Sequence, residues 1–277
     1  MAIGVEKIMA EIIVLQTGYT LISPATPNAS AVPFSFAYTG LFQKRKNRIK
    51  VPVKAFLVIV NGKKILVDTG WSRECAKHPI KHLGFGMYFA SEPVMTENEA
   101  VINRFEKMNI KPSDLDAVIF THLDGDHTSG IVDLIGAKHY YTTRNEVEYA
   151  DRNKIRYKNF WKNINLEVMN MVDDRSAPFG KSCDLFGDSS VVVYLTKGHS
   201  AGSVAVKIND NGKFAVLAGD NGYCRASWEQ LVLPGIIYDK NAMKKSLTFI
   251  NELSKKKECV TVLAAHDPEI TQTHFKY

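Results

Sequence analysis

Four side chains that can bind a metal ion fall within six residues in the stretch Thr121-His122-Leu123-Asp124-Gly125-Asp126-His127. The apolar run Ala117–Thr121 before it predicts a buried strand, and Thr128-Ser129-Gly130 after it leads toward a helix. Alternate residues of an extended loop aim their side chains at different points of one cavity. Imidazoles suit zinc, iron and manganese, whereas carboxylates favour harder ions and can bridge two of them. The stretch therefore predicts a metal centre at the end of a strand.

The same arrangement recurs further along the chain. Val191–Leu195 leads to His199, Phe214–Gly219 ends at Asp220, and Val260–Ala265 ends at His266. Buried strands whose carboxyl ends carry polar residues are how α/β folds build a site on a rigid scaffold. One such strand end arises by chance, because loops are polar, but four in one chain point to a shared site.

The remaining pattern predicts an ordinary α/β arrangement. We expect a strand at Glu11–Gln16, and an irregular segment up to residue 50 that includes Pro33 and Phe34. Val51–Val60 and Lys64–Asp68 flank Asn61-Gly62, the strongest two-residue hairpin turn. A helix is expected from Thr96 to about Met108, and residues 146–174 read as an amphipathic helix plus loop. That last segment is either a wall of the substrate site or a solvated surface helix.

Composition places the chain among soluble globular proteins. It has 277 residues, 45% hydrophobic and 23% charged, with no repeat or linker, so we expect one domain over residues 1–277. The net charge of +6 is weak evidence for nucleic acid, which we do not expect as a partner. Glu6, Lys7 and Glu11 interrupt the N-terminal apolar run, and no stretch has membrane-spanning length. Four cysteines form no CxxC pair and read as reduced thiols, so we expect a cytoplasmic protein: Cys75, Cys183, Cys224 and Cys259.

Taken in order, these motifs resemble those of the metallo-β-lactamase-fold hydrolases, over about residues 51 to 267. The order is Asp68-Thr69-Gly70 after a strand, HxxxDH at 122–127, Gly198-His199, Gly219-Asp220 and a late His266. With Tyr223 three residues after Asp220, the spacing is most similar to the N-acyl-homoserine lactone lactonase branch. The resemblance implies an αβ/βα four-layer sandwich with a dinuclear metal site.

It also implies roles for individual residues. His122 and His199 would serve a first metal, Asp126, His127 and His266 a second, and Asp220 would bridge the two. Asp68 would not bind a metal itself but would form a hydrogen bond with one of the metal ligands. The cofactors would be two divalent ions, most simply zinc.

Asp124 departs from the family pattern HxHxDH, because it stands where the second histidine belongs. A carboxylate there favours a harder ion such as manganese or iron, and flavodiiron proteins of the same superfamily carry a glutamate at that place. Asp124 is a candidate ligand of the first metal, or an aspartate that caps its loop.

The chemistry implied is hydrolysis of a small molecule. Two cations that share a water supply hydroxide at neutral pH, and it attacks a lactone or ester carbonyl. Tyr223 is expected to donate a hydrogen bond to the oxyanion, and Asp126 or Asp220 to pass a proton to the leaving alkoxide. Residues 17–50, 71–95 and 146–180 are expected to recognise the substrate.

Several alternatives remain open at this point. They are a diiron oxidoreductase or oxygenase, a thioesterase or phosphodiesterase of the same fold, and a metal-binding module without activity. The basic run Lys44–Lys50 fits a nuclease but more often forms a solvated loop. Cys75, His78 and His82 have metal-ligand spacing, but Pro79 breaks the helix that would align them. Cys224 is expected in the core, and a homodimer is one expectation for the assembly.

Overall fold

The computed structural model describes residues 9–32, 36–41 and 43–277, so Glu6, Lys7, Pro33 and Phe34 lie outside the described residues. Two β-sheets run through this part of the chain. The first has the strand order β14 (His274–Lys276), β1 (Glu11–Ile22), β2 (Ile49–Val60), β3 (Lys63–Val67), β5 (Ala117–Ile119), β6 (Tyr140–Thr142) and β7 (Leu166–Val168), with β4 (Glu92–Val94) paired to β1. The second has the order β13 (Cys259–Ala264), β12 (Lys213–Gly219), β11 (Val204–Asp210), β10 (Val191–Leu195), β9 (Lys181–Asp184) and β8 (Val172–Asp173).

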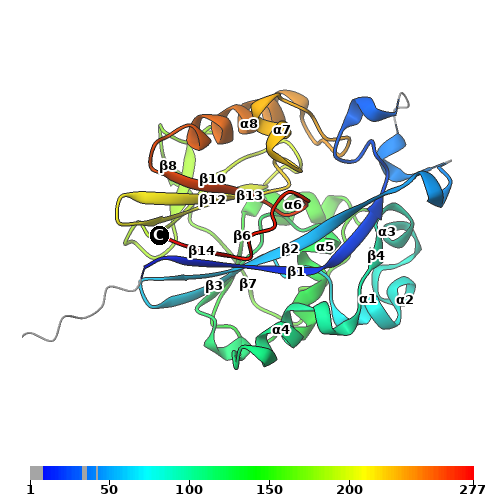
Figure 1. Ribbon diagram of the computed structural model, residues 1–277, viewed down its shortest axis with the longest axis horizontal. Helices are drawn as coiled ribbons and strands as arrows, with labels where there is room; N and C mark the ends of the chain where they lie inside the picture. Colours follow the sequence, from blue (N-terminus) through cyan, green and yellow to red (C-terminus); the bar gives the residue numbers. More distant parts are fainter. Residues whose placement is uncertain (1–8, 33–35, 42) are drawn as a thin grey trace, which may run out of the picture.

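Helices cover the outer faces of both sheets (Figure 1). They are α1 (Arg73–Lys77), α2 (Pro79–Leu83), α3 (Phe85–Ala90), α4 (Val101–Lys107), α5 (Gly125–Thr128), α6 (Arg144–Arg152), α7 (Arg225–Glu229) and α8 (Lys240–Ser254). In Figure 1, α7 and α8 lie beyond the second sheet, while α1 to α4 lie on the opposite side of the first. The four-layer sandwich that the family resemblance implies is confirmed. None of the described helices is both long and apolar enough to cross a membrane.

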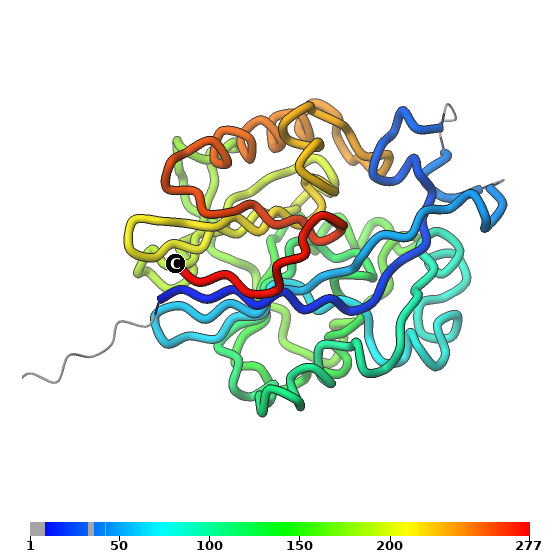
Figure 2. The backbone as a smooth tube through the Cα atoms, viewed as in Figure 1, coloured from blue at the N-terminus to red at the C-terminus, as the bar shows by residue number. Residues whose placement is uncertain are grey.

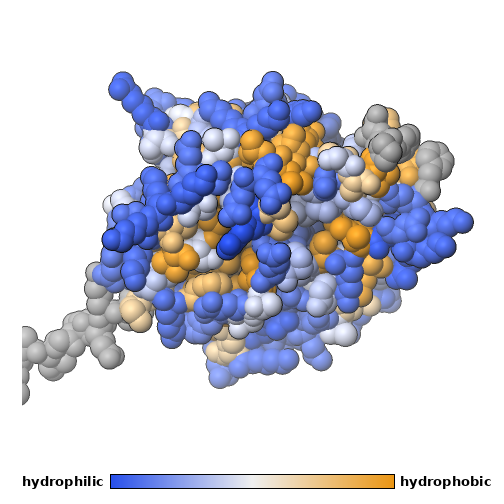
Figure 3. All heavy atoms as spheres, turned by 45° about the horizontal axis from the view of Figure 1, so that its top comes forward, coloured by the Kyte–Doolittle hydropathy of each residue, from blue (hydrophilic) through white to orange (hydrophobic). Residues whose placement is uncertain are grey.

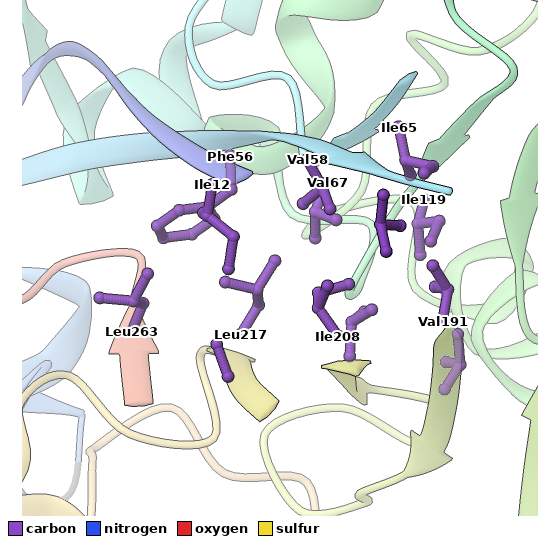
Figure 4. Packing of buried hydrophobic residues seen from close by; sticks show 14 of the residues in the cluster. Ile12, Phe56, Val58, Ile65, Val67, Ile119, Val191, Ile208, Leu217 and Leu263 are labelled. Carbon is purple, nitrogen blue, oxygen red and sulfur yellow. The ribbon is translucent and has the colours of Figure 1, made fainter. Parts of the chain in front are cut away.

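The main core lies between the two sheets. Phe56 and Val58 of β2 face Leu217 and Ile208 of the second sheet across this layer (Figure 4). The alternate residues of β2, Ala55 and Leu57, pack instead against the helices. Because both faces of β2 are buried, its sequence reads as an almost unbroken apolar run.

The predicted hairpin is confirmed. Val60 pairs with Lys63, and Asn61 and Gly62 both adopt positive φ angles, 48° and 74°. This is the backbone that a two-residue primed turn requires.

Strand β1 is longer than expected, since it continues to Ile22 and not only to Gln16. The register against β2 shifts between Gln16 and Tyr19, and Gly18 has a φ of 91° there. A Cβ on Gly18 would lie 2.5 Å from Cβ of Met95. The bulge interrupts the alternating pattern from which a strand is recognised, which explains the shorter prediction.

The predicted helix at residues 96–108 is divided. A 3₁₀ turn at Glu97–Glu99 precedes α4, and Ala100 between them has an extended backbone, with ψ at 147°. The expected start is confirmed by the backbone N–H of Thr96, which donates to the Glu99 carboxylate at 2.6 Å. In residues 146–174 the helix is α6, but the edge strand β7 was not predicted.

Several strands end at the same rim of the sandwich. β3 and β5 are parallel neighbours in the first sheet, and β12 and β13 are parallel neighbours in the second. β10 runs in the same direction as β12, because both are antiparallel to β11. The residues that follow β5, β10, β12 and β13 are thereby brought together.

Two segments far apart in the chain close this rim from one side. Residues 23–32 and 36–41 lie beside residues 225–237 (Figure 2), and Ala29 N–H donates to the Leu233 carbonyl at 2.9 Å. The surface shown in Figure 3 is largely hydrophilic, with hydrophobic patches between the charged side chains. All four cysteines are free, as the sequence predicts: Cys75, Cys183, Cys224 and Cys259.

Candidate metal centre

Seven side chains of types that can bind a metal converge at this rim. They are His122, Asp124, Asp126, His127, His199, Asp220 and His266. Asp126 and His127 do not lie on an extended loop as expected, because the chain turns into the short helix α5 at Gly125. Gly219, at the end of β12, has a φ of 54°, and a Cβ there would lie 2.8 Å from Thr121. A glycine therefore permits the close approach of the two strand ends that carry His122 and Asp220.

The four histidines share one orientation. Each Nδ1 contacts an oxygen: Thr121 Oγ1 for His122, Asp68 Oδ2 for His127, the Ile236 carbonyl for His199 and the Pro52 carbonyl for His266. Contacts of this kind fix an imidazole ring and leave Nε2 for a metal. All four rings are buried, so each Nε2 faces protein groups and not bulk water.

The ligand atoms form two groups, His122, His199 and Asp220 in one, and Asp126, His127 and His266 in the other. Asp220 Oδ1 lies 3.2 Å from Nε2 of both His127 and His266, while its Oδ2 lies 3.8 Å from Nε2 of His199. Separations of about 3.4 Å are expected between atoms that each lie about 2.1 Å from one ion. Asp220 thus faces both groups.

Unpartnered polar atoms test whether ions fit here. Among the described residues, His122 Nε2, His127 Nε2 and Asp220 Oδ1 are buried and have no hydrogen-bond partner. Buried polar atoms of a folded protein are nearly always paired, so these three require an explanation. Divalent cations at the two groups would supply it, and the residues therefore fit the ions that the fold implies.

Asp68 holds one of these ligands from behind. It is fully buried, and its Oδ2 lies 2.8 Å from Nδ1 of His127. Thr121 donates to the same carboxylate through its backbone N–H and its hydroxyl, both at 2.8 Å. Asp68 thereby ties the end of β3 to the loop that carries His122 and His127.

In the group of Asp126, His127 and His266, positive and negative charges compensate one another. Burial opposes a charge on His127 and His266, but Asp220 and neighbouring carboxylates outweigh it and raise both pKa values, that of His266 to about 10. Burial also opposes ionisation of Asp220, yet His266 and His127 hold its pKa well below its usual value. Without an ion, the protons on the histidines neutralise the buried carboxylates.

Asp124 has a partner that the sequence did not indicate. Arg156 donates to Asp124 Oδ1 through Nε at 2.7 Å and to Oδ2 through Nη2 at 2.6 Å. Asp124 Oδ2 also lies 2.9 Å from His199 Nε2 and 3.3 Å from His122 Nε2. Arg156 is one of several basic residues in its segment, and nothing in the pattern sets it apart from the others.

Glu146, at the first turn of α6, was also missed. It is fully buried and accepts hydrogen bonds from the Leu123 N–H at 3.0 Å, the Ser200 hydroxyl at 2.6 Å and the Gly202 N–H at 3.0 Å. One carboxylate therefore connects the loop that carries His122 with the loop that carries His199. A glutamate at a helix start is common, so the sequence did not reveal this role.

A cavity of about 840 Å³ opens beside the metal-binding side chains. Asp124, Asp126, Asp220, Tyr223 and His266 line its floor. Its walls come from residues 20–26, 38–41, 71–91 and 149–156, so each of the three segments expected to recognise the substrate contributes to the cavity. Residues 149–156 form a wall of this cavity. This position agrees with the first interpretation of residues 146–174, as a wall, and not with a solvated surface helix.

Tyr223 lies against the second group. Its ring stacks on His266, with centroids 5.1 Å apart and planes 20° apart. Burial raises the pKa of the phenol well above its usual value, and the carboxylates of Asp220 and Asp126 add to the shift. The hydroxyl therefore keeps its proton and remains a hydrogen-bond donor.

Three other candidates take no part in this site. Cys75 is buried, and the described residues hold no metal-binding group that includes it, His78 or His82. Within the basic run, Arg45 pairs with Glu92 at 3.0 Å and Arg48 lies over the Phe89 ring at 4.9 Å. Cys224 is half-buried before α7 and not fully in the core as expected.

The sequence profile of the Metallo-beta-lactamase superfamily matches residues 48–253. The chain belongs to this superfamily. It is 27% identical over 229 residues to an N-acyl homoserine lactonase of Rhizobium radiobacter, covering 79% of this chain and 83% of the relative. An N-acyl homoserine lactonase of Bacillus cereus is 25% identical over 236 residues, covering 80% and 84%. This metallo-beta-lactamase-fold chain is thus a hydrolase with lactonases among its relatives.

Solved structures agree on the fold. An N-acyl homoserine lactone hydrolase with the product N-hexanoyl-L-homoserine bound at its catalytic metal centre superposes with a TM-score of 0.76 at 20% identity, over 95% of each chain. A probable metal-dependent hydrolase from Staphylococcus aureus gives a TM-score of 0.68 at 16% identity, over 98% and 94%.

Proposed function

We propose that this hydrolase opens lactones or related carboxylic esters with two divalent metal ions, and that N-acyl-homoserine lactones are the first substrates to test. One observation carries the proposal: four buried histidines and the carboxylate of Asp220 converge beside a large cavity, which Asp220 and His266 line. The named activity of the lactonase relatives supports the substrate class.

The metal ligands follow from the two groups. His122, His199 and Asp220 would hold one ion, and Asp126, His127, His266 and Asp220 the other. When bound, such ions polarise a carbonyl and lower the pKa of a water molecule toward neutral. Imidazole-rich ligand sets favour zinc, so zinc is the ion we propose.

Tyr223 and the carboxylates complete the reaction. The phenol lines the cavity beside Asp220 and His266, where its hydroxyl can donate a hydrogen bond to the oxygen that gains charge. Asp126 and Asp220 also line the cavity, and either can carry a proton to the leaving alkoxide. Both carboxylates are ionised, because nearby histidines outweigh the effect of burial on their pKa values.

The carboxylate of Asp124 suggested the redox alternative, but this carboxylate has a positively charged partner in the folded chain. A carboxylate at Asp124 would add negative charge to the first centre and favour iron. Arg156 binds that carboxylate through two hydrogen bonds and neutralises it. We therefore propose hydrolysis and not an oxidation.

The free cysteines also support the cytoplasmic location that we propose.

A substrate panel tests the function. Zinc-loaded protein is assayed by pH-stat on N-acyl-homoserine lactones of increasing chain length, simple lactones, aryl esters, a thioester and a phosphodiester. We expect turnover of lactones or esters that falls at least 100-fold in Asp220→Ala. Turnover of the phosphodiester or thioester alone would reassign the substrate class, and turnover of none would contradict the proposal.

A further inference from the structure

Arg156 reaches into the first of the two ligand groups. It follows α6 in the chain, and its guanidinium binds the Asp124 carboxylate through two parallel hydrogen bonds of 2.7 and 2.6 Å. Its side chain is only 23% exposed. A paired arginine of this kind is held in place far better than an exposed lysine or arginine.

The same guanidinium contacts a candidate metal ligand. Nη2 of Arg156 lies 3.0 Å from Nε2 of His199, and Nη1 donates to the His199 carbonyl at 3.4 Å. His199 Nδ1 faces the Ile236 carbonyl at 3.1 Å and must donate there. Nε2 also lies 2.9 Å from Oδ2 of Asp124. With Nδ1 donating, Nε2 of the neutral ring is an acceptor, and of its two neighbours only the guanidinium, which has donors only, can bond to it. Arg156 consequently uses the lone pair that an ion at this group would need.

The second group contains no such cation. Among the described residues, the ion pairs of Asp126 and Asp220 all involve histidines: His127, His199 and His266. In the described part of the chain, no arginine or lysine pairs with these two carboxylates, whereas Arg156 pairs with Asp124 beside the first group. The two groups therefore differ in what an ion must displace.

We propose that Arg156 makes the two metal positions unequal: the group of Asp126, His127 and His266 takes the first ion tightly, and the group of His122 and His199 takes a second ion only after Arg156 leaves His199. This rests on the proposed function, since it assumes that the ligand groups bind ions. In the one-ion state, the guanidinium supplies the positive charge beside His199. Arg156 also lines the cavity, so that charge faces the substrate.

A different role for Arg156 predicts the opposite result. If Arg156 only orients Asp124 as a ligand of the first ion, its removal weakens binding at that position, as the loss of an outer partner usually does. If Arg156 competes with the ion, its removal strengthens binding, because a cation next to a dication is lost and Asp124 becomes free to bind. The sign of the change separates the two roles.

The test is a titration of metal-free protein with Co²⁺, whose visible absorption reports each occupied position, followed by competition with Zn²⁺. In the wild type we expect two steps at least tenfold apart in affinity. Arg156→Gln should tighten the second step at least tenfold and leave the first step unchanged. Arg156→Lys keeps the charge and should leave the second step weak. Arg144→Ala removes an exposed arginine of α6 that does not line the cavity, and it should match the wild type.

Each outcome decides one point. Two equal steps in the wild type, or a weaker second step in Arg156→Gln, would overturn the role of Arg156 and leave the proposed function standing. No Co²⁺ binding in any variant would instead refute the proposed function. Circular dichroism and melting curves show whether each variant is folded. Should Arg156→Gln not fold, Arg156→Met carries the same prediction, because it fills the space without a charge.

Discussion

At Tyr223, the hydroxyl group decides whether the side chain takes part in catalysis or only packs. The ring stacks on His266, and Tyr223→Phe keeps that contact. If the hydroxyl stabilises an oxyanion, the change lowers kcat about tenfold, roughly 1.4 kcal/mol, with little effect on KM. The metal content should not change. Steady-state kinetics on the best lactone measures this, and full kcat in the Phe variant would show that Tyr223 only packs.

At His266, metal binding should release protons. The folded pKa is raised to about 10, so the metal-free ring holds a proton throughout the neutral range, and the ion must displace it. Metal affinity should therefore rise with pH between about 6 and 9. Calorimetry in two buffers of different ionisation enthalpy counts the released protons. The absence of proton release at pH 7 would contradict the charge state assigned to His266.

At Asp124, the sequence identified a possible metal ligand but not the residue that pairs with it. The departure from the family motif marks this position as unusual and names a possible ligand. Its partner, Arg156, lies 32 residues away in sequence, in a segment whose fold no periodicity predicts. The sequence did not indicate the role of Glu146 for a similar reason, because its partners lie in loops that only the folded chain brings together.

Among the elements, α6 matters most for the site. Its residue Glu146 connects the loops that follow β5 and β10, through bonds to Leu123 and Gly202. A glutamine keeps the shape but offers one acceptor oxygen, and its amide group faces donors. We expect Glu146→Gln to cost about 2 kcal/mol of stability, lowering the unfolding temperature by roughly 4 °C.

A control on the same helix sharpens this prediction. Glu148→Gln removes the same charge at an exposed position of α6 and should leave the unfolding temperature within about 1 °C of the wild type. Differential scanning calorimetry compares the two variants. Equal melting temperatures for both would show that Glu146 does not hold the loops together.

The elements were predictable where local rules dominate. The Asn61-Gly62 turn and the strand Val191–Leu195 were predicted with their bounds, because turn chemistry and β-branched runs act locally. The end of β1 depends on a bulge at Gly18 that fits against Met95, and β7 is a short edge strand. Such features depend on packing partners that lie elsewhere in the chain.

For the whole molecule, metal binding should contribute to stability. Buried carboxylates of both sheets meet at the rim, and ions that bind only the folded chain stabilise it. Removal of metal with a chelator should lower the unfolding temperature by several degrees, and added zinc should restore it. At 100 times its dissociation constant, an ion contributes about 2.7 kcal/mol. Identical melting curves with and without chelator would contradict ion binding at this rim.

The layered architecture was predicted through the resemblance to the metallo-β-lactamase fold, which rests on a long and specific order of motifs. The sequence located the segments that form the cavity walls but not the shapes of these walls, because the shapes depend on how residues 20–26, 38–41, 71–91 and 149–156 pack around the rim. The single domain and the homodimer stay predictions. Light scattering on the purified protein measures the latter.

Metal-dependent turnover of one lactone tests the central claim most directly. Metal-free protein is mixed with N-hexanoyl-homoserine lactone, and ring opening is followed by proton NMR while zinc is added in steps. We expect no opening above the uncatalysed rate without metal and a rate that rises with each zinc bound. Ring opening that proceeds equally well without metal, or none with metal-loaded and folded protein, would contradict it.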